Sequence, residues 1–195
     1  MSSNNPVADF FDARASRWDE WAEDDLGFVR TLFDRIGIQK GDKVLDLACG
    51  TGVVTALLHE YSGAPVVGMD IAPKMIEIAK KKYENSDFAT FVSQNFMSYE
   101  GDPFDVIVLY NAYPHFLDPK GLAEKLHSSL KSGGRFAIVH SLGRQRLAKH
   151  HEGLSIKISR DLAPVEIEAE SFKERFEITV AEEGEDFYLI IGKVL

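Results

Sequence analysis

The alternation of apolar strand patterns with helical patterns between Lys43 and His140 constrains the fold of this chain most strongly. Strands are predicted at residues 43–47, 65–70, 89–93, 104–110 and 135–140, and helices at 51–59, 73–83 and 120–130. The run from Val106 to Leu109 is continuously apolar, which is typical of a strand covered on both faces. Strands and helices in this order predict a doubly wound α/β fold built on a parallel sheet.

The two ends of the chain follow other patterns. Apolar residues recur at three- and four-residue spacing up to Ile36, so the first 36 residues predict two amphipathic helices. Near the C-terminus a short helix is predicted from Pro164 to about Lys173. Strands at 175–181 and 187–194 then flank an acidic turn, which predicts an antiparallel hairpin and a mostly parallel sheet of seven strands. We expect one domain, 1–195, with an N-terminal helical cover (1–37), a core (38–140) and a final segment with the hairpin (141–195).

Composition excludes several classes of function. The 22 Lys and Arg against 31 Asp and Glu give a formal net charge of −9, which is unsuited to binding nucleic acid. A single cysteine excludes an internal disulfide and a cysteine-rich metal site. The longest apolar run is too short to cross a membrane, and the first residues lack the features of a secretory signal. We therefore expect a cytoplasmic protein without a membrane partner.

A glycine-containing loop follows the first predicted strand, at residues 44–52. Ala48 stands where a dinucleotide-binding loop has its first glycine, and Asp46 would repel a pyrophosphate. A carboxylate beside such a loop instead suits a cationic ligand, and S-adenosylmethionine carries an ammonium and a sulfonium but no phosphate. Asp70, at the end of the second predicted strand, can accept hydrogen bonds from both ribose hydroxyls.

The ordered set of motifs at 44–52, 66–70, 94–96, 104–107 and 130–134 resembles the class I S-adenosylmethionine-dependent methyltransferase family. The similarity covers about residues 44–139 and implies a Rossmann-like sheet with S-adenosylmethionine as cofactor. By this resemblance the loop residues Ala48, Gly50 and Gly52 lie beneath the methionine portion, Asp46 near its ammonium, Asp70 at the ribose, and Ile71, Met75, Asn95 and Phe96 around the adenine. Asn95 departs from the aspartate common in the family, but its side-chain oxygen can still accept a hydrogen bond from the adenine amino group.

Catalytic residues are expected where the fourth and fifth strands end, because open α/β sheets bind ligands outside the carboxyl ends of their strands. His115 follows the fourth strand and His140 closes the fifth. Histidine titrates near neutrality and can take the proton of a hydroxyl, thiol or protonated nitrogen acceptor. His115 is the first candidate for a general base and His140 the second, and Tyr113 is a candidate substrate contact. The alternative for each histidine is a structural hydrogen bond to the backbone.

Residues 140–160 reverse the charge of the chain, with five Lys and Arg against one Glu. Arg144 and Arg160 in this segment are predicted to attract an anionic substrate, the alternative being a solvated basic helix face. Histidines 115, 140, 150 and 151 allow a metal site in principle, but their spacing matches no known ligand pattern, so no metal is predicted.

The function predicted from these features is methyl transfer from S-adenosylmethionine to an oxygen, nitrogen or sulfur atom of a small metabolite, with anionic metabolites among the candidates. Residues 111–114 read Asn-Ala-Tyr-Pro rather than the Asn-Pro-Pro-Tyr of enzymes that methylate nucleic-acid bases. The single Cys49 excludes a thiol relay. The alternative is a non-catalytic module that binds S-adenosylmethionine and acts on a partner.

Overall fold

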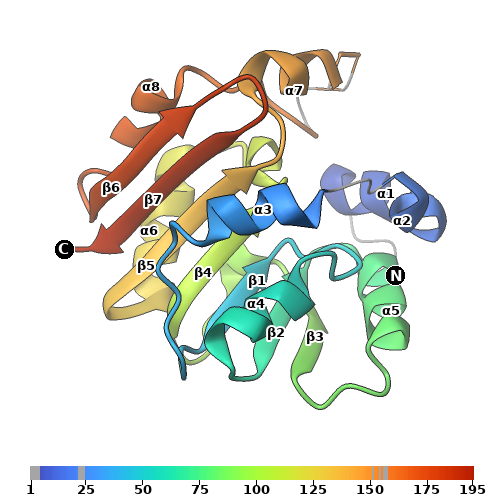
Figure 1. Ribbon diagram of the computed structural model, residues 1–195. Coiled ribbons are helices and arrows are strands. Elements are labelled where there is room, and N and C mark those ends of the chain that lie inside the picture. The colour runs from blue at the N-terminus through green and yellow to red at the C-terminus, as the bar shows by residue number, and fades with distance from the viewer. Residues whose placement is uncertain (1–4, 22–24, 151, 154, 156–157) are drawn as a thin grey trace.

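A seven-stranded sheet forms the centre of the protein in the computed structural model, which describes residues 5–21, 25–150, 152–153, 155 and 158–195 (Figure 1). The strands are β1 (Val44–Leu47), β2 (Val66–Asp70), β3 (Ala89–Ser93), β4 (Phe104–Tyr110), β5 (Leu130–His140), β6 (Phe176–Glu183) and β7 (Tyr188–Val194), in the order β3-β2-β1-β4-β5-β7-β6. Strands β1 to β5 are parallel, whereas β7 runs antiparallel to both β5 and β6. The predicted fold class is confirmed.

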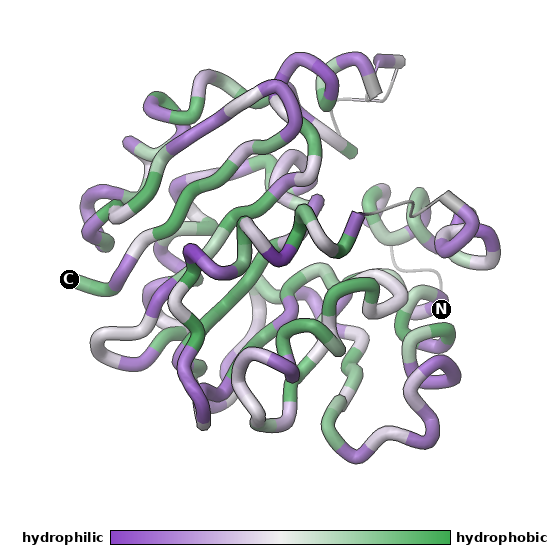
Figure 2. Tube along the Cα trace, viewed as in Figure 1, coloured by the Kyte–Doolittle hydropathy of each residue, from purple (hydrophilic) through white to green (hydrophobic). Residues whose placement is uncertain are grey.

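Helices cover both faces of this sheet, as the continuous apolar strands predict. Along β4, Val106 and Val108 pack into a core with α3 (Leu26–Phe33) and α4 (Thr55–Ser62) on one face. The intervening Ile107 and Leu109 pack into a second core with α6 (Pro119–Ser129) and α8 (Val165–Glu170) on the other. This alternation with a period of two is what a pleated strand imposes. Figure 2 shows the apolar strands as the green centre of the molecule.

The N-terminal segment differs from the two helices predicted for it. It forms α1 (Pro6–Asp12), the 3-10 helix η1 (Ala15–Arg17), α2 (Trp18–Trp21) and, after residues outside the described part, α3. Asn5 caps α1 and Asp25 caps α3, each side chain accepting two backbone N–H bonds. The Asp12 carboxylate accepts a hydrogen bond of 2.8 Å from the Lys74 amide, in the first turn of α5 (Pro73–Lys82). Such tertiary contacts, invisible in the apolar spacing, set where these helices end.

Two further boundaries differ from the predicted ones. Helix α4 begins at Thr55 rather than at residue 51, because residues 51–54 complete the turn after β1 and Gly52 there has a φ of +80°. Strand β5 begins at Leu130 rather than at residue 135, and its register with β4 shifts between Phe104 and Val106. Gly133, with a φ of +71°, lies within the extra residues.

The carboxyl ends of the parallel strands meet at one edge of the sheet, where the strand order reverses between β1 and β4. Three short helices follow strand ends at this edge: η2 (Phe96–Ser98) after β3, η3 (Tyr113–His115) after β4 and α7 (Arg144–His150) after β5. An open α/β sheet binds its ligands at such a reversal. Among the described helices, none combines the length and the apolar character needed to cross a bilayer.

Candidate functional site

The loop after β1 turns sharply because three of its residues adopt left-handed backbone angles. Ala48 has a φ of +57°, Gly50 of +54° and Gly52 of +80°. A side chain at Gly52 would place its Cβ 2.9 Å from the Tyr83 ring, so only glycine fits there. Ala48 bears a Cβ in a conformation that disfavours one, and strain of this kind is concentrated at functional sites.

Two buried carboxylates lie beside this loop, at the ends of β1 and β2. Asp46 is only 1% exposed and accepts a 2.6 Å hydrogen bond from the Thr55 hydroxyl. Asp70 accepts from the Gly50 amide at 2.9 Å and from the Ala72 amide at 2.8 Å, so it ties the loop to the start of α5. Burial raises the pKa of Asp46 to about 7 and that of Asp70 to about 6. Both carboxylates would regain their charge beside a positively charged ligand.

Four residues on the α5 and η2 side complete this part of the site. Ile71 lines it from the turn after β2 and Met75 from the first turn of α5, and Met75 is almost fully buried. Asn95 and Phe96 line it from the turn after β3. The Asn95 side-chain oxygen accepts from the Met97 amide at 3.0 Å and caps η2. An amide oxygen has two lone pairs, so this cap leaves capacity for a second donor.

His115 approaches the same region from the loop after β4. Its Nδ1 lies 2.8 Å from the Ile158 carbonyl oxygen, and its ring meets the edge of Phe11 at a centroid distance of 4.8 Å. Since a carbonyl oxygen only accepts, Nδ1 carries the proton and donates it in this bond. Burial lowers the pKa of His115, which keeps the imidazole neutral.

Asn111 and Ser141 join the ends of β4 and β5 beside His115. The Asn111 amide group donates to the Ser141 hydroxyl at 2.9 Å, and the Ser141 backbone N–H donates to the Asn111 oxygen at 3.0 Å. Asn111 has a φ of +52°, a conformation that asparagine tolerates better than most residues. Neither residue of this pair was predicted as part of the site, although both directly follow predicted strands.

The N-terminal segment closes over the site. Phe11 of α1 and Trp18 of α2 line it, and Trp18 Nε1 would lie 3.6 Å from a Cβ added at Gly50. Behind them, Asp19 accepts a hydrogen bond of 2.5 Å from the Thr51 hydroxyl and pairs with Lys82 at 2.8 Å. These polar contacts fasten the segment to the loop and to α5.

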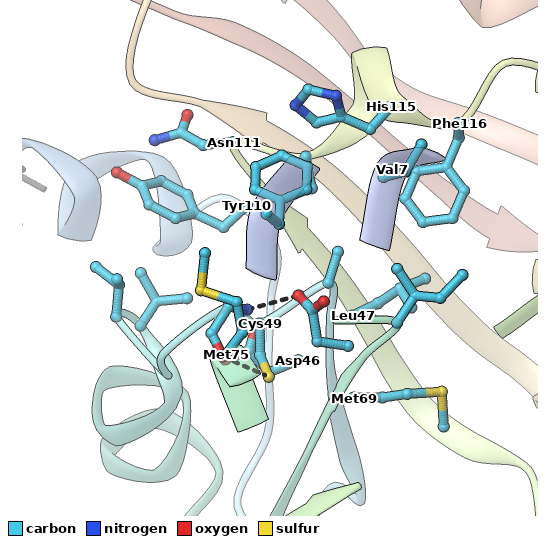
Figure 3. Close-up of a pocket in the computed structure, with 18 of the residues that line it drawn as sticks. Val7, Asp46, Leu47, Cys49, Met69, Met75, Tyr110, Asn111, His115 and Phe116 are labelled. Carbon is cyan, nitrogen blue, oxygen red and sulfur yellow. Dashed lines mark hydrogen bonds between the residues drawn. The ribbon is translucent and has the colours of Figure 1, made fainter. Parts of the chain in front are cut away.

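Asp46, Asp70, His115 and the other side chains described above as lining the site surround one cavity of about 990 Å³. Figure 3 shows His115, Phe116 and Val7 on one side of it and Asp46, Leu47 and Cys49 on the other. A volume near the upper end of the usual range for small-ligand sites, about 300–1,000 Å³, gives room for two molecules side by side.

Five predicted site residues lie outside the lining of this cavity: Gly52, Tyr113, His140, Arg144 and Arg160. His140 is fully buried and packs against Tyr188 of β7, so it does not share a crevice with His115. Arg144 pairs with Glu183 at 3.3 Å, on the terminal hairpin.

Tyr113 and Arg160 belong instead to a buried cluster beneath η3. The Tyr113 hydroxyl donates to Glu168 at 2.7 Å, and Arg160 makes two hydrogen bonds to the same carboxylate at 2.6 and 3.0 Å. Arg160 also donates to the backbone oxygens of Pro114 and Phe116. The cluster therefore holds in place the short helix that carries His115.

No group of three or more His, Cys, Asp or Glu side chains able to hold a metal occurs within the described part of the chain. His151, one of the four histidines considered for a metal, and Lys157 of the basic segment lie outside the described residues, and the side chain of His150 is not described. The structure therefore adds no argument for the metal alternative.

The sequence model of a family described as a methyltransferase domain matches residues 38–179. This chain belongs to the methyltransferase-domain family. The match spans most of the chain, and the resemblance to class I S-adenosylmethionine-dependent methyltransferases is confirmed. The same span contains the glycine loop, both buried aspartates and His115.

Curated relatives of this methyltransferase domain are matched over part of their length. A malonyl-[acyl-carrier protein] O-methyltransferase of Acetivibrio thermocellus is 30% identical over 66% of the chain and 46% of the relative. The demethylmenaquinone methyltransferase of Chlorobaculum tepidum is 32% identical over 53% of the chain and 43% of the relative. The sterol 24-C-methyltransferase of Saccharomyces cerevisiae is 35% identical, over 53% of the chain and 28% of the relative. The matched region thus spans less than half the length of each of these three relatives.

Solved structures share the fold over nearly the whole chain. A Haloferax volcanii methyltransferase, solved in complex with the activator Trm112, gives a TM-score of 0.77 at 21% identity, covering 94% of this chain and 97% of that one. The N-methyltransferase NodS of Bradyrhizobium japonicum, solved with S-adenosyl-L-homocysteine, gives 0.71 at 14% identity, covering 96% and 98%. At these identities the likeness shows the fold alone, which agrees with the strand order above.

Proposed function

We propose that this protein transfers a methyl group from S-adenosylmethionine to a small acceptor molecule that binds beside His115. One observation carries the proposal: the buried carboxylates Asp46 and Asp70 and the neutral His115 line a single cavity at the carboxyl ends of the strands. Membership of the methyltransferase-domain family supports the same reaction class, as do the names of the relatives, which include a sterol methyltransferase and a demethylmenaquinone methyltransferase.

The residues of the loop side fit S-adenosylmethionine. Burial raises the pKa values of Asp46 and Asp70. A bound ligand that carries an ammonium and a sulfonium would lower these pKa values again. Asp70 uses one lone pair of each oxygen for the Gly50 and Ala72 amides, and a carboxylate has about four, so it can also accept from the two ribose hydroxyls. When bound, the cofactor supplies a methyl group activated by its sulfonium. Ile71, Met75 and Asn95 then line the binding site of the adenine.

His115 acts on the acceptor. With its proton on Nδ1 and directed at the Ile158 carbonyl, the neutral imidazole has its lone pair on Nε2. That nitrogen can take the proton of a hydroxyl group as its oxygen attacks the methyl group, or the proton of an ammonium group before its nitrogen attacks. Methyl transfer is an in-line displacement, so the walls of the cavity contribute by holding the two molecules in line. Residues 1–37 serve as the cover of the site, as Phe11 and Trp18 in its lining support.

Turnover of a panel of hydroxyl, amine and thiol acceptors, measured as release of S-adenosylhomocysteine, tests the proposal. We expect release with some members of the panel, and in the His115→Gln variant a rate lowered by about 10²- to 10⁴-fold at unchanged affinity for S-adenosylhomocysteine. Glutamine keeps the polarity of the side chain but cannot titrate. Binding of S-adenosylmethionine without any turnover would favour the non-catalytic module, and full turnover by His115→Gln would remove the role of the histidine.

Cofactor affinity is expected to rise with pH. Asp46, with a pKa of about 7, is mostly protonated in the free protein below that pH, and its ionised form is the one that attracts an ammonium. Binding therefore releases a proton, and the affinity for S-adenosylhomocysteine falls as the pH drops below 7, approaching about tenfold per pH unit, and falls more steeply below pH 6, where Asp70 is also protonated. Calorimetric titration in buffers of different ionisation enthalpy measures both quantities. Asp46→Asn is expected to flatten the profile near pH 7 and to keep the break near pH 6 that Asp70 causes, whereas a profile unchanged by Asp46→Asn would contradict the assignment.

A further inference from the structure

We infer that the acceptor is an uncharged, largely apolar molecule with a planar ring and one nucleophilic group, rather than an anionic metabolite. The inference rests on the proposed function, since it concerns the half of the cavity next to His115. It departs from the expectation drawn from the basic segment, and three properties of the described residues carry it: the charges in the lining, the partners of the arginines and the apolar walls.

The lining of the cavity carries excess negative charge. Its described charged side chains are those of Asp25, Asp46, Asp70, Asp118, Asp186 and Arg146. The one basic group in this set, Arg146, already pairs with Asp186 at the mouth of the cavity. An anion that enters from the mouth therefore meets no unpaired cation among these residues and is repelled by the carboxylates.

The two arginines predicted to attract an anion have partners elsewhere. Arg144 pairs with Glu183 of the terminal hairpin, and Arg160 makes its two short hydrogen bonds to the buried Glu168. An anionic substrate would have to displace a carboxylate that each arginine already holds. These two arginines thus hold their parts of the segment against the hairpin and α8.

Apolar side chains form the walls around the acceptor position. Val7, Phe11 and Phe28 come from the N-terminal helices, Phe116 and Leu142 from the loops after β4 and β5, and Leu147 from α7. In Figure 3 Val7 and Phe116 lie next to each other beside His115. Three phenylalanine rings among six wall residues suit a flat ring, which aromatic side chains contact by offset stacking and by their edges.

Three hydrogen-bonding side chains of the lining form one group at the carboxyl ends of the strands. Asn111 and Ser141 lie beside each other at the ends of β4 and β5, and His115 follows on η3. A ligand with one polar group directed at this place and an apolar body against the walls matches the distribution. The polar group is then the nucleophile whose proton His115 takes.

Two fluorescent probes test the inference: a naphthol and the hydroxynaphthoate that adds a carboxylate to the same ring. Each is titrated with the full chain at low ionic strength, with and without S-adenosylhomocysteine. We expect the naphthol to bind at least about tenfold more tightly than the hydroxynaphthoate, because a charge near the lining carboxylates is disfavoured by more than 1 kcal/mol. Equal binding, preference for the carboxylate, or binding of neither probe would overturn the inference.

The measurement without S-adenosylhomocysteine separates this inference from the proposed function. If S-adenosylhomocysteine does not bind, the proposed function fails, but the preference between the two probes is still measured. If S-adenosylhomocysteine binds and the hydroxynaphthoate is preferred, the cofactor assignment stands and the acceptor class is wrong.

Asp186→Asn provides a second readout, because it removes the partner of Arg146 at the mouth of the cavity. The released arginine is expected to reduce the preference for the naphthol by about threefold to fivefold, the size expected for one solvated charge pair. Glu185→Gln is the matched control, since it changes the net charge equally at the neighbouring residue, which lies outside the cavity lining. An equal effect of both variants, or no effect of Asp186→Asn, would count against the charge argument.

Discussion

Asp70→Asn is expected to lower the affinity for S-adenosylhomocysteine by about 100-fold, since hydrogen bonds to a charged group contribute about 1.5–3 kcal/mol each. The Asp70 carboxylate lies at the end of β2, where it accepts from the Gly50 and Ala72 amides and faces the cavity. An asparagine has the same shape, but its amide group presents a donor where the proposed ribose hydroxyls donate. Calorimetric titration measures the loss.

The stability of the free variant distinguishes this loss from unfolding. The folded pKa of Asp70 is about 6, above its unfolded value, so the native protein loses stability as the pH rises from about 4 through 6. Asparagine cannot ionise, so Asp70→Asn removes the Asp70 contribution to this decline. Its NH2 group faces either the Gly50 or the Ala72 N–H, so we expect a somewhat lower midpoint of thermal unfolding that depends less on pH between about 4 and 6, with the free variant still folded at the temperature of the titration. Asp87→Asn, the same change at an exposed position, is the control. Undiminished affinity in Asp70→Asn would refute the assignment of Asp70 to the cofactor.

Glu168→Leu is expected to lower the free energy of unfolding by about 3–5 kcal/mol. Glu168 is 6% exposed and accepts hydrogen bonds from Tyr113, from Arg160 and from the Ala163 amide. Its removal leaves the Arg160 charge partly buried without a partner, the situation that makes broken buried pairs so destabilising. For a domain of this size the midpoint of thermal unfolding should fall by roughly 10 °C.

Two further variants make this prediction specific. Glu166→Leu, an identical change at an exposed position of α8, should alter the unfolding free energy by no more than about 0.5 kcal/mol. Combining Glu168→Leu with Arg160→Met removes both charges and should restore most of the lost stability. If the double variant is no more stable than Glu168→Leu alone, the unpaired Arg160 is not the cause.

Local sequence patterns were sufficient to predict the fold and to name most of the residues that line the loop side of the cavity. The apolar runs in β1, β2 and β4 define the strands without long-range information, and the alternation of elements defines the sheet. Asp46 and Asp70 could be found because each sits at a fixed place on its strand. His115 could be found because it follows β4 within a few residues.

The partners of charged side chains could not be predicted in the same way. Arg144 and Glu183 are 39 residues apart, and Tyr113 and Glu168 are 55 apart, so their pairing depends on how the hairpin and α8 fold back onto the sheet. Without these partners, the arginines of the basic segment therefore predicted a site that attracts anions. The division of the N-terminal segment into several short helices was not predicted for the same reason. Asp12, the last residue of α1, accepts a hydrogen bond from the Lys74 amide of α5, which is 62 residues away in the sequence.

The contacts of the N-terminal segment bear on the timing of the proposed reaction. Asp19 accepts a hydrogen bond from the Thr51 hydroxyl and pairs with Lys82, and Asp12 accepts one from the Lys74 amide. These contacts connect the segment at two points to the elements proposed to bind the cofactor. In the proposed reaction, S-adenosylhomocysteine could leave the cavity on this side only if these polar contacts open. Its release would then depend on ionic strength, because salt weakens the exposed ion pair between Asp19 and Lys82.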